Sequence, residues 1–153
     1  MTEEDPMANV REVFEQGTDT FNAHDLEGFA AVLAEDVVFS APGGMRGQGK
    51  DACTEFFGGW IVAFPDAHVE VHDLHITDDV AVEEATFTGT HEGVLHTPNG
   101  DIPPTGRRVN IDYIQVHRLR DGNQVSFHLV FDRFEMLEQL GLIPAPAGGG
   151  LLD

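Results

Sequence analysis

The first third of the chain spaces its apolar residues as an α-helix does. Val10, Phe14 and Phe21 lie near one stripe, because side chains three or four residues apart share a helix face. Asp25 is suited to cap the helix that follows, since an aspartate side chain accepts hydrogen bonds from free N–H groups in a first helical turn. The predicted helices cover about residues 6–23, 26–35 and 50–63.

The period of the apolar residues changes to two after residue 67, which is typical of β-strands. Val69 and Val71, for example, alternate with His68 and Glu70. Glycine and proline are frequent in residues 41–49 and 93–107, which predicts loops there, and residues 120–123 have the composition of a hairpin turn. The predicted strands cover about residues 37–39, 67–76, 80–90, 108–119 and 125–131, and a closing helix follows over residues 133–140.

Three helices followed by antiparallel strands predict an α+β fold with the helices on one side of the sheet. A strongly twisted antiparallel sheet that wraps around helices can leave a cavity at its open end. We expect one domain over residues 6–144, with disordered tails at residues 1–5 and 145–153.

The composition excludes several partners. The chain has 27 acidic and eight basic residues, a net charge of -19, so nucleic acid and anionic membranes are poor partners for its negative field. The sequence contains no membrane-spanning run and no apolar leader. Its single cysteine, Cys53, forms no intramolecular disulfide. We expect a soluble, cytoplasmic protein.

The eight histidines do not predict a metal site. His68 and His72 share one face of a predicted strand, but a strand rise of about 3.3 Å per residue separates their Cα atoms by about 13 Å. One metal ion cannot reach both at that distance. Nucleotide-binding glycine motifs are also missing, so we expect neither a metal nor an organic cofactor.

Asp132 lies between Phe131 and Phe134 in one of the most apolar segments of the chain. It begins the spacing Asp-x-x-Glu, which favours a helix cap. A carboxylate in an apolar pocket could instead transfer protons, because burial raises its pKa. Both alternatives, cap and pocket acid, remain open on spacing alone.

Strand alternation places His128 on the same face as Asp132, and Gln115 on the same face as His117 in the preceding strand. A two-residue turn at the hairpin would set Gln115 opposite His128 and create one polar wall. A three-residue turn with a glycine bulge would instead place Ile114 and Val116 near His128. The polar wall therefore depends on the register of the hairpin.

The order of elements and several motifs resemble the SnoaL-like polyketide cyclase family of the nuclear transport factor 2-like superfamily. Most specific are PPTGRRV before a hairpin and a strand-borne aspartate before a QLG helix. The matching pieces are FNAHDLEGF (21–29), FPD (64–66), GTHEG (89–93), PPTGRRV (103–109) and LVFDRFEMLEQLGLIP (129–144).

This resemblance implies a cone-shaped α+β fold whose strongly curved, mixed or antiparallel sheet encloses a pocket for a small apolar or polycyclic molecule. It implies that Asp132 is the general acid/base of a cofactor-free aldol ring closure, and that His91, Gln115 and His117 bind carbonyl oxygens. Many relatives carry Trp at the position of His128, so this histidine adds a titratable ring to the pocket wall. The resemblance also implies a homodimer or homotetramer.

The leading hypothesis is a cofactor-independent acid/base enzyme that cyclises or isomerises a small polyketide-like ketone. A non-catalytic ligand-binding or assembly domain with the same fold is the alternative from another class. An epoxide hydrolase or hydratase is a third possibility, for which Asp112 and Arg118 are the available acid and arginine. Fold alone does not choose among these activities.

Overall fold

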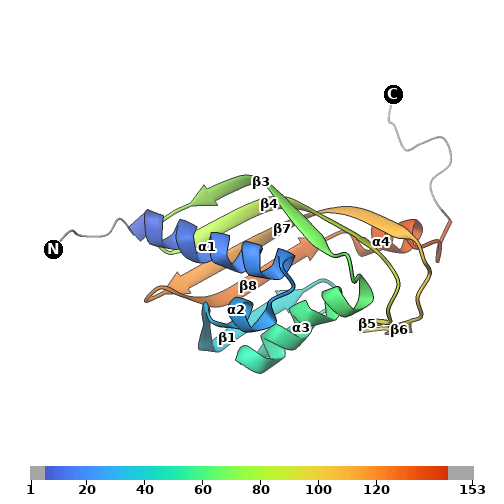
Figure 1. Cartoon of the computed structure of the whole chain (residues 1–153), viewed down its shortest axis with the longest axis horizontal. Coiled ribbons are helices and arrows are strands. Elements are labelled where there is room, and N and C mark those ends of the chain that lie inside the picture. Colours follow the sequence, from blue (N-terminus) through green and yellow to red (C-terminus); the bar gives the residue numbers. More distant parts are fainter. Residues whose placement is uncertain (1–5, 145–153) are drawn as a thin grey trace.

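The computed structural model describes residues 6–144 (Figure 1), so the predicted tails, residues 1–5 and 145–153, lie outside the described residues. Three of the four helices occupy the predicted ranges to within one residue. The exception is the second, α2 (Leu26–Ala30), which is capped as predicted by Asp25. The other helices are α1 (Pro6–Asn22), α3 (Lys50–Ala63) and α4 (Arg133–Gln139).

The predicted continuation of the second helix to residue 35 is wrong, because β1 (Leu33–Ala41) begins there instead. Leu33 and Val37 are buried in the core. Leu33 also aligns with Gln124 of the last strand. Burial and pairing with a distant strand therefore outweigh the local helical spacing of the apolar residues.

Six strands form one mixed sheet in the order β2-β1-β8-β7-β4-β3. All neighbouring strands are antiparallel except β1 and β8, which run parallel. Besides β1, its members are β2 (Met45–Gln48), β3 (His68–Ile76), β4 (Val80–Thr90), β7 (Arg108–Arg120) and β8 (Asn123–Phe131).

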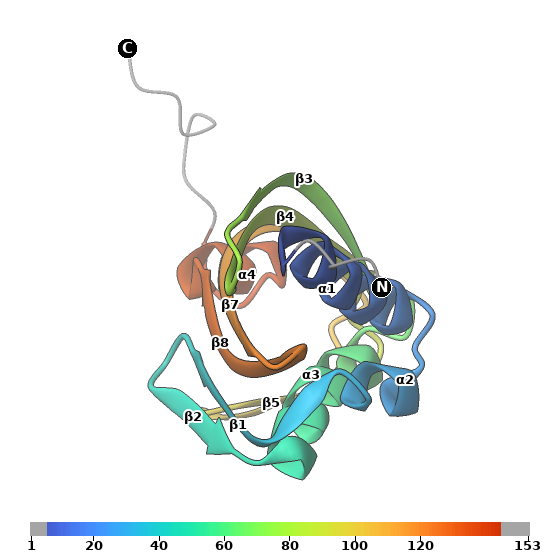
Figure 2. The ribbon, with the colours of Figure 1, turned by 90° about the vertical axis from the view of Figure 1, so that its left-hand side faces the viewer.

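The sheet curls, and the three N-terminal helices lie along the open side of the curl (Figure 2). The main core fills the space between these helices and the inner face of the sheet, and Val37, Phe64 and Ile111 are among its most buried side chains. A smaller cluster of Val10, Phe14 and Ala81 packs α1 against β4. The predicted cone-shaped α+β fold is confirmed.

Two segments predicted as loops contain short strands. β2 follows the turn at Gly43 and Gly44, and β5 (Leu95–Thr97) pairs with β6 (Gly100–Ile102) as a separate hairpin. The sequence did not predict β2 because its glycines are typical of loops. Gly47 is nevertheless a strand residue, and it must be glycine because it lies beneath the ring of Phe39, where a Cβ would be 2.2 Å from a ring carbon.

Candidate active site

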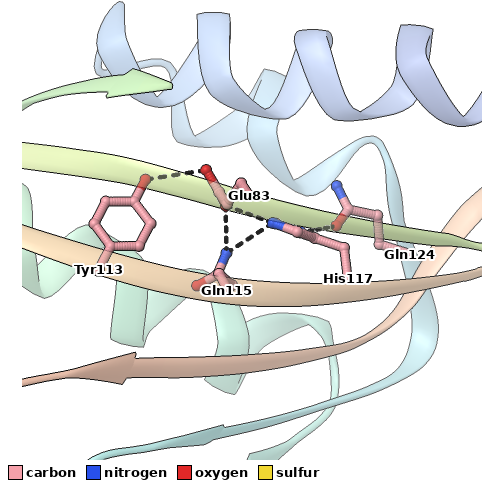
Figure 3. Close-up of polar contacts among 5 residues, drawn as sticks. All are labelled: Glu83, Tyr113, Gln115, His117 and Gln124. Atoms are coloured by element: carbon pink, nitrogen blue, oxygen red, sulfur yellow. Dashed lines mark hydrogen bonds and ion pairs between the residues drawn. The ribbon is translucent and has the colours of Figure 1, made fainter. Parts of the chain in front are cut away.

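Five polar side chains meet on the inner face of the sheet (Figure 3). Glu83 comes from β4, Tyr113, Gln115 and His117 come from β7, and Gln124 comes from β8. Strand alternation explains the cluster, because residues two apart point to the same face. Glu83 and Gln115 are directly opposite across β4 and β7, so two neighbouring strands bring the acid and the polar residues of β7 together.

Glu83 accepts hydrogen bonds from three directions. Its Oε1 lies 2.5 Å from Nε2 of His117 and accepts from the Gln115 amide at 3.2 Å. Its Oε2 accepts from the Tyr113 hydroxyl at 3.2 Å. On the other side of the imidazole, Nδ1 of His117 lies 2.8 Å from Oε1 of Gln124.

The network is almost completely removed from water. Glu83 is 2% exposed and His117 is 5% exposed. An unpaired carboxylate at such a place would be costly, so its hydrogen bonds are what make Glu83 tolerable there. Burial, the negative charge of Glu83 and the hydrogen bond to it raise the pKa of Tyr113 well above its usual value. Tyr113 is therefore a hydroxyl donor at neutral pH.

These polar groups form one side of a cavity of about 80 Å³. Phe14 of α1 packs edge-on against His117 at a centroid distance of 5.2 Å, and Phe127 lies 5.0 Å from the same ring. The remaining wall is mainly apolar and includes Phe21, Phe29, Phe57, Trp60, Phe87, Ile111, Leu129, Phe131 and Met136. This inner cavity therefore holds one acid and one imidazole in contact within apolar surroundings.

Gln115 and His117 lie where the sequence predicted, in the wall of a cavity. Asp132 does not. Its side chain is exposed and caps α4, accepting from the backbone N–H groups of Phe134 at 3.0 Å and Glu135 at 3.1 Å. The structure thus assigns Asp132 the cap alternative, and the carboxylate in the inner cavity is Glu83 instead.

His128 lies on the outer face of the sheet, contrary to prediction. The hairpin turn has two residues, Asp121 and Gly122, but the register shifts between Arg118 and Leu119. Val125 is the extra residue of this bulge, and His128 therefore faces Val116 rather than Gln115.

The outer position of His128 is exposed, and its ring is 2.9 Å from the hydroxyl of Ser40. Asp112 and Arg118, the pair considered for epoxide hydrolysis, are also exposed on the outer face of β7. None of these three side chains lines the inner cavity.

His91 is fully buried but does not line the inner cavity either. Thr105 contributes its backbone N–H, 3.2 Å from Nδ1 of His91, and its hydroxyl, 3.0 Å from the same atom. The ring also lies 5.3 Å from that of Phe64. His91 thus joins the loop after β4 to the segment before β7, which is a structural position and not the predicted carbonyl-binding one.

The sequence interpretation gave no site role to three residues of this network: Glu83, Tyr113 and Gln124. Glu83 shares a strand face with Ala81, Ala85 and Phe87, all of them buried. An acid at one position of an otherwise apolar strand face was therefore the signal that could have identified it. Its neighbour Glu84 obscured that signal, because two consecutive acids look like ordinary surface residues.

Two further sequence expectations concern metals and membranes. Within residues 6–144 no three histidine, cysteine or acidic side chains are grouped as a metal ion would require. Among the helices of this same range, none has the length and apolar character needed to cross a membrane.

Residues 10–127 match the family model described as a SnoaL-like domain. This match includes all five residues of the polar network and ends before Asp132. Among the curated proteins no sequence is significantly similar to the chain.

Solved structures support the same assignment. AclR from Streptomyces galilaeus, described as a candidate hydroxylase, is 25% identical with a TM-score of 0.78, over 93% of this chain and 87% of that one. IdmH from Streptomyces antibioticus, described as a candidate polyketide cyclase, is 26% identical with a TM-score of 0.71, over 90% and 99%.

An LEH-like epoxide hydrolase from M. tuberculosis is 17% identical with a TM-score of 0.69, over 89% of this chain and 92% of that one, and shares the fold. The match covers residues 10–127, which include the three N-terminal helices and most of the curled sheet (Figure 2). This chain therefore belongs to the SnoaL-like domain family.

Proposed function

We propose that the protein is a cofactor-independent acid/base enzyme that acts on a small, largely apolar ketone, with Glu83 and His117 as its proton-transfer pair. The contact of 2.5 Å between Oε1 of Glu83 and Nε2 of His117, buried beside an apolar cavity, is the observation that carries this proposal. Proton transfer by a positioned side chain contributes roughly 10²–10⁴-fold to a reaction rate.

The hydrogen bonds define how many protons the pair holds. With Oε1 of Gln124 as acceptor, Nδ1 of His117 carries a proton. One further proton then lies between Nε2 and Glu83, on either the imidazole or the carboxyl group. Among the described residues, Oε2 of Glu83 is bonded only to Tyr113, so this oxygen is the one that we expect to meet a substrate.

The proposed reaction begins at a carbon next to a carbonyl group. Glu83 removes a proton from this carbon, and the electron pair of the C–H bond moves to the carbonyl oxygen as an enolate. Donation from Tyr113, whose raised pKa keeps its hydroxyl protonated, stabilises the negative oxygen. To do so, the Tyr113 hydroxyl donates to the substrate oxygen instead of to Oε2 of Glu83, its acceptor in the free protein.

The enolate can react in two ways, and in both of them the proton that Glu83 removed is returned to the product. In an aldol closure its carbon attacks a second carbonyl group, and Glu83 returns the proton to the new alkoxide. In an isomerisation Glu83 returns the proton to a different carbon. No oxidant, metal or cofactor takes part in either sequence.

The hydrolase alternative has less support. The only described acid in the inner cavity is Glu83, and no arginine lines that cavity to serve as its partner. The remaining rival is a ligand-binding domain without catalysis. A ligand-binding domain would bind the ketone but would not accelerate proton transfer, so measuring proton transfer distinguishes it from the proposed enzyme.

The experiment is hydrogen–deuterium exchange at the α-carbon of a small aryl ketone such as 2-tetralone, followed by NMR. Wild-type protein should accelerate exchange over buffer, and Glu83→Gln should reduce this acceleration roughly 10²–10⁴-fold. Glu84→Gln is the matched control, because Glu84 is the adjacent exposed residue of the same strand. It should exchange like the wild type.

Circular dichroism and thermal unfolding will show whether Glu83→Gln is folded, and His117→Gln gives a second test of the pair. Exchange by Glu83→Gln at the wild-type rate would rule out Glu83 as the base. Binding of the ketone by the wild-type protein without any acceleration would favour the ligand-binding domain.

A further inference from the structure

A second cavity of about 270 Å³ adjoins the inner one. The turn between β1 and β2, the β5–β6 hairpin and α4 form its walls. Trp60, Phe131 and Met136 belong to the linings of both cavities. These three residues therefore lie between this outer cavity and the inner one.

The partition lies at the tyrosine end of the polar network. Phe131 is directly opposite Tyr113, whereas Phe127, four residues earlier on β8, is opposite His117. At about 3.3 Å per residue this distance along the strand is about 13 Å. Trp60 packs edge-on against Phe131 at a centroid distance of 5.6 Å. A molecule that passes this pair of rings meets Tyr113 and Glu83 first.

Arg133 is the basic side chain of the outer cavity that has no acid beside it. Among the described residues, four basic side chains lie within 4.0 Å of a carboxylate: Arg11, Lys50, Arg108 and Arg120. Arg133 forms no such pair, as is also true of Arg46, Arg107 and Arg118, but of these four only Arg133 lines the outer cavity. It donates to the neutral side chain of Asn99 at 3.1 Å. The acid in the same lining, Asp101, is held by His96 at 2.6 Å.

The position of the Arg133 guanidinium is fixed by two turns. A Cβ on Gly43, whose φ is +88°, would lie 2.5 Å from Nη1 of Arg133 and 3.2 Å from Pro98. The guanidinium thus fits between the β1–β2 turn and the β5–β6 turn. It has donors left for a ligand, because a guanidinium carries five N–H groups.

We propose that the outer cavity is the second compartment of the substrate site and that Arg133 binds a carboxylate there. The substrate class is then an elongated keto acid, with its ketone at Glu83, an apolar middle beside Trp60 and its carboxylate at Arg133. The placement of the ketone at Glu83 rests on the proposed function. Arginine suits the other end, because its planar fork matches carboxylate geometry.

Size and charge both favour this arrangement. Pockets for drug-sized ligands measure about 300–1,000 Å³. Neither the inner nor the outer cavity reaches that range alone, whereas the two together do. The net charge of -19 repels anions over most of the surface. An acidic ligand therefore needs a local cation, and Arg133 supplies one at the outer cavity.

A purely structural role for Arg133, in which it only joins the two turns, makes a different prediction. Both roles predict some loss of stability when Arg133 is replaced. Only the ligand role predicts a loss of affinity that depends on the charge of the ligand. The test therefore compares an acid with its uncharged amide.

Calorimetry would measure binding of 6-acetyl-2-naphthoic acid and its primary amide to the wild type, Arg133→Gln, Arg133→Lys and Arg11→Gln. The wild type should prefer the acid roughly 10–100-fold, as for hydrogen bonds to a charged group. Arg133→Gln should bind both equally, and Arg133→Lys should keep part of the preference. Arg11→Gln removes an exposed arginine of α1 and should behave like the wild type.

Trp60 adds an internal reporter, because it is the single tryptophan of the chain. Both ligands should change its fluorescence if they pass the partition. Equal affinity of the wild type for acid and amide would overturn the proposal, as would an acid preference that survives in a folded Arg133→Gln or binding without a change at Trp60. Glu83→Gln separates the two proposals, since it should lose exchange but keep the acid preference.

Discussion

Adjacent glutamates of β4 occupy opposite environments. Glu83 is buried among hydrogen-bond donors, whereas Glu84 is exposed and lies 3.2 Å from His75. Moving one residue along the strand therefore leads from an exposed acid that is hydrogen-bonded to a histidine to an acid in an apolar cavity. At the scale of single residues, the chemistry of this protein depends on which face of a strand each side chain meets.

Asp132 provides a test of its cap role. Asp132→Ala should lower the free energy of unfolding by about 1 kcal/mol, because two N–H groups of α4 lose their acceptor. Asp132→Asn should be nearly neutral, since asparagine caps equally well. Urea unfolding measures both. If a folded Asp132→Asn variant no longer exchanged the α-proton of the ketone, Asp132 would be the catalytic acid/base and not only a helix cap.

His91 should make stability sensitive to acid. Burial lowers its pKa below the ordinary value of 6.5, so the unfolded chain binds a proton more readily than the folded one. Its contribution to stability is present above the unfolded pKa and is lost as the pH falls through the folded pKa. Nδ1 of His91 accepts a hydrogen bond from the backbone N–H of Thr105. A second ring proton would occupy this nitrogen and break that bond, which adds to the cost of protonation.

We expect the stability difference between wild type and His91→Gln to shrink between about pH 7.5 and about pH 5. Urea unfolding at both pH values measures it. His75→Gln is the control, because His75 is largely exposed. A difference for His91→Gln that did not change with pH would contradict the assignment.

Whole elements differ in how far the sequence predicts them. Long periodic segments such as α3 and β4 are predictable, because many side chains repeat the same signal. β2, β5 and β6 are not, since their glycines and prolines resemble those of loops. Gln115 and His117 were placed correctly by alternation within one strand. His128 was not, because its face depends on the bulge at Val125, and pairing between strands leaves no local signal.

Gly93 joins the loop after β4 to the end of α3 and should not tolerate a side chain. Its N–H donates to the carbonyl of Ala63 at 3.0 Å, and a Cβ would lie 2.1 Å from the carbonyl oxygen of Val62. Gly93→Ala should cost about 1–3 kcal/mol or more, the usual effect of overpacking. Thermal unfolding measures this.

Gly59 is the matched control, because it lies in the middle of α3 with open space around it. Gly59→Ala should stabilise the protein by up to about 1 kcal/mol, as alanine favours a helix over glycine. If Gly93→Ala were as stable as the wild type, the backbone contact would not be a constraint.

The molecule as a whole exposes apolar side chains on the outer face of its sheet. Val38, Val130 and Ile114 are 42%, 49% and 47% exposed, and they lie on the consecutive strands β1, β8 and β7. Asp112 and Arg118 flank this patch at the two ends of one strand face. A second copy related by a twofold axis would place each arginine near the partner's aspartate. The homodimer implied by the family resemblance remains a prediction, and this face is where we expect it.

Ile114→Glu should therefore yield a monomer in sedimentation at micromolar concentration, whereas the wild type should sediment as a dimer. Val62→Glu is the control, because Val62 is 62% exposed on α3, away from this face. A wild-type monomer, or a dimer that persists in Ile114→Glu, would count against this surface.

The parallel pairing of β1 with β8 also determines when the sheet can finish folding. Ser40 and His128, which meet across these strands, are 88 positions apart in the chain. On the ribosome, β1 emerges long before its partner has been synthesised. Contacts between residues so distant in sequence slow folding. Until β8 is available, the unpaired edge of β1 can also promote aggregation. The cavity should therefore close in the last step of folding, once the C-terminal hairpin has docked.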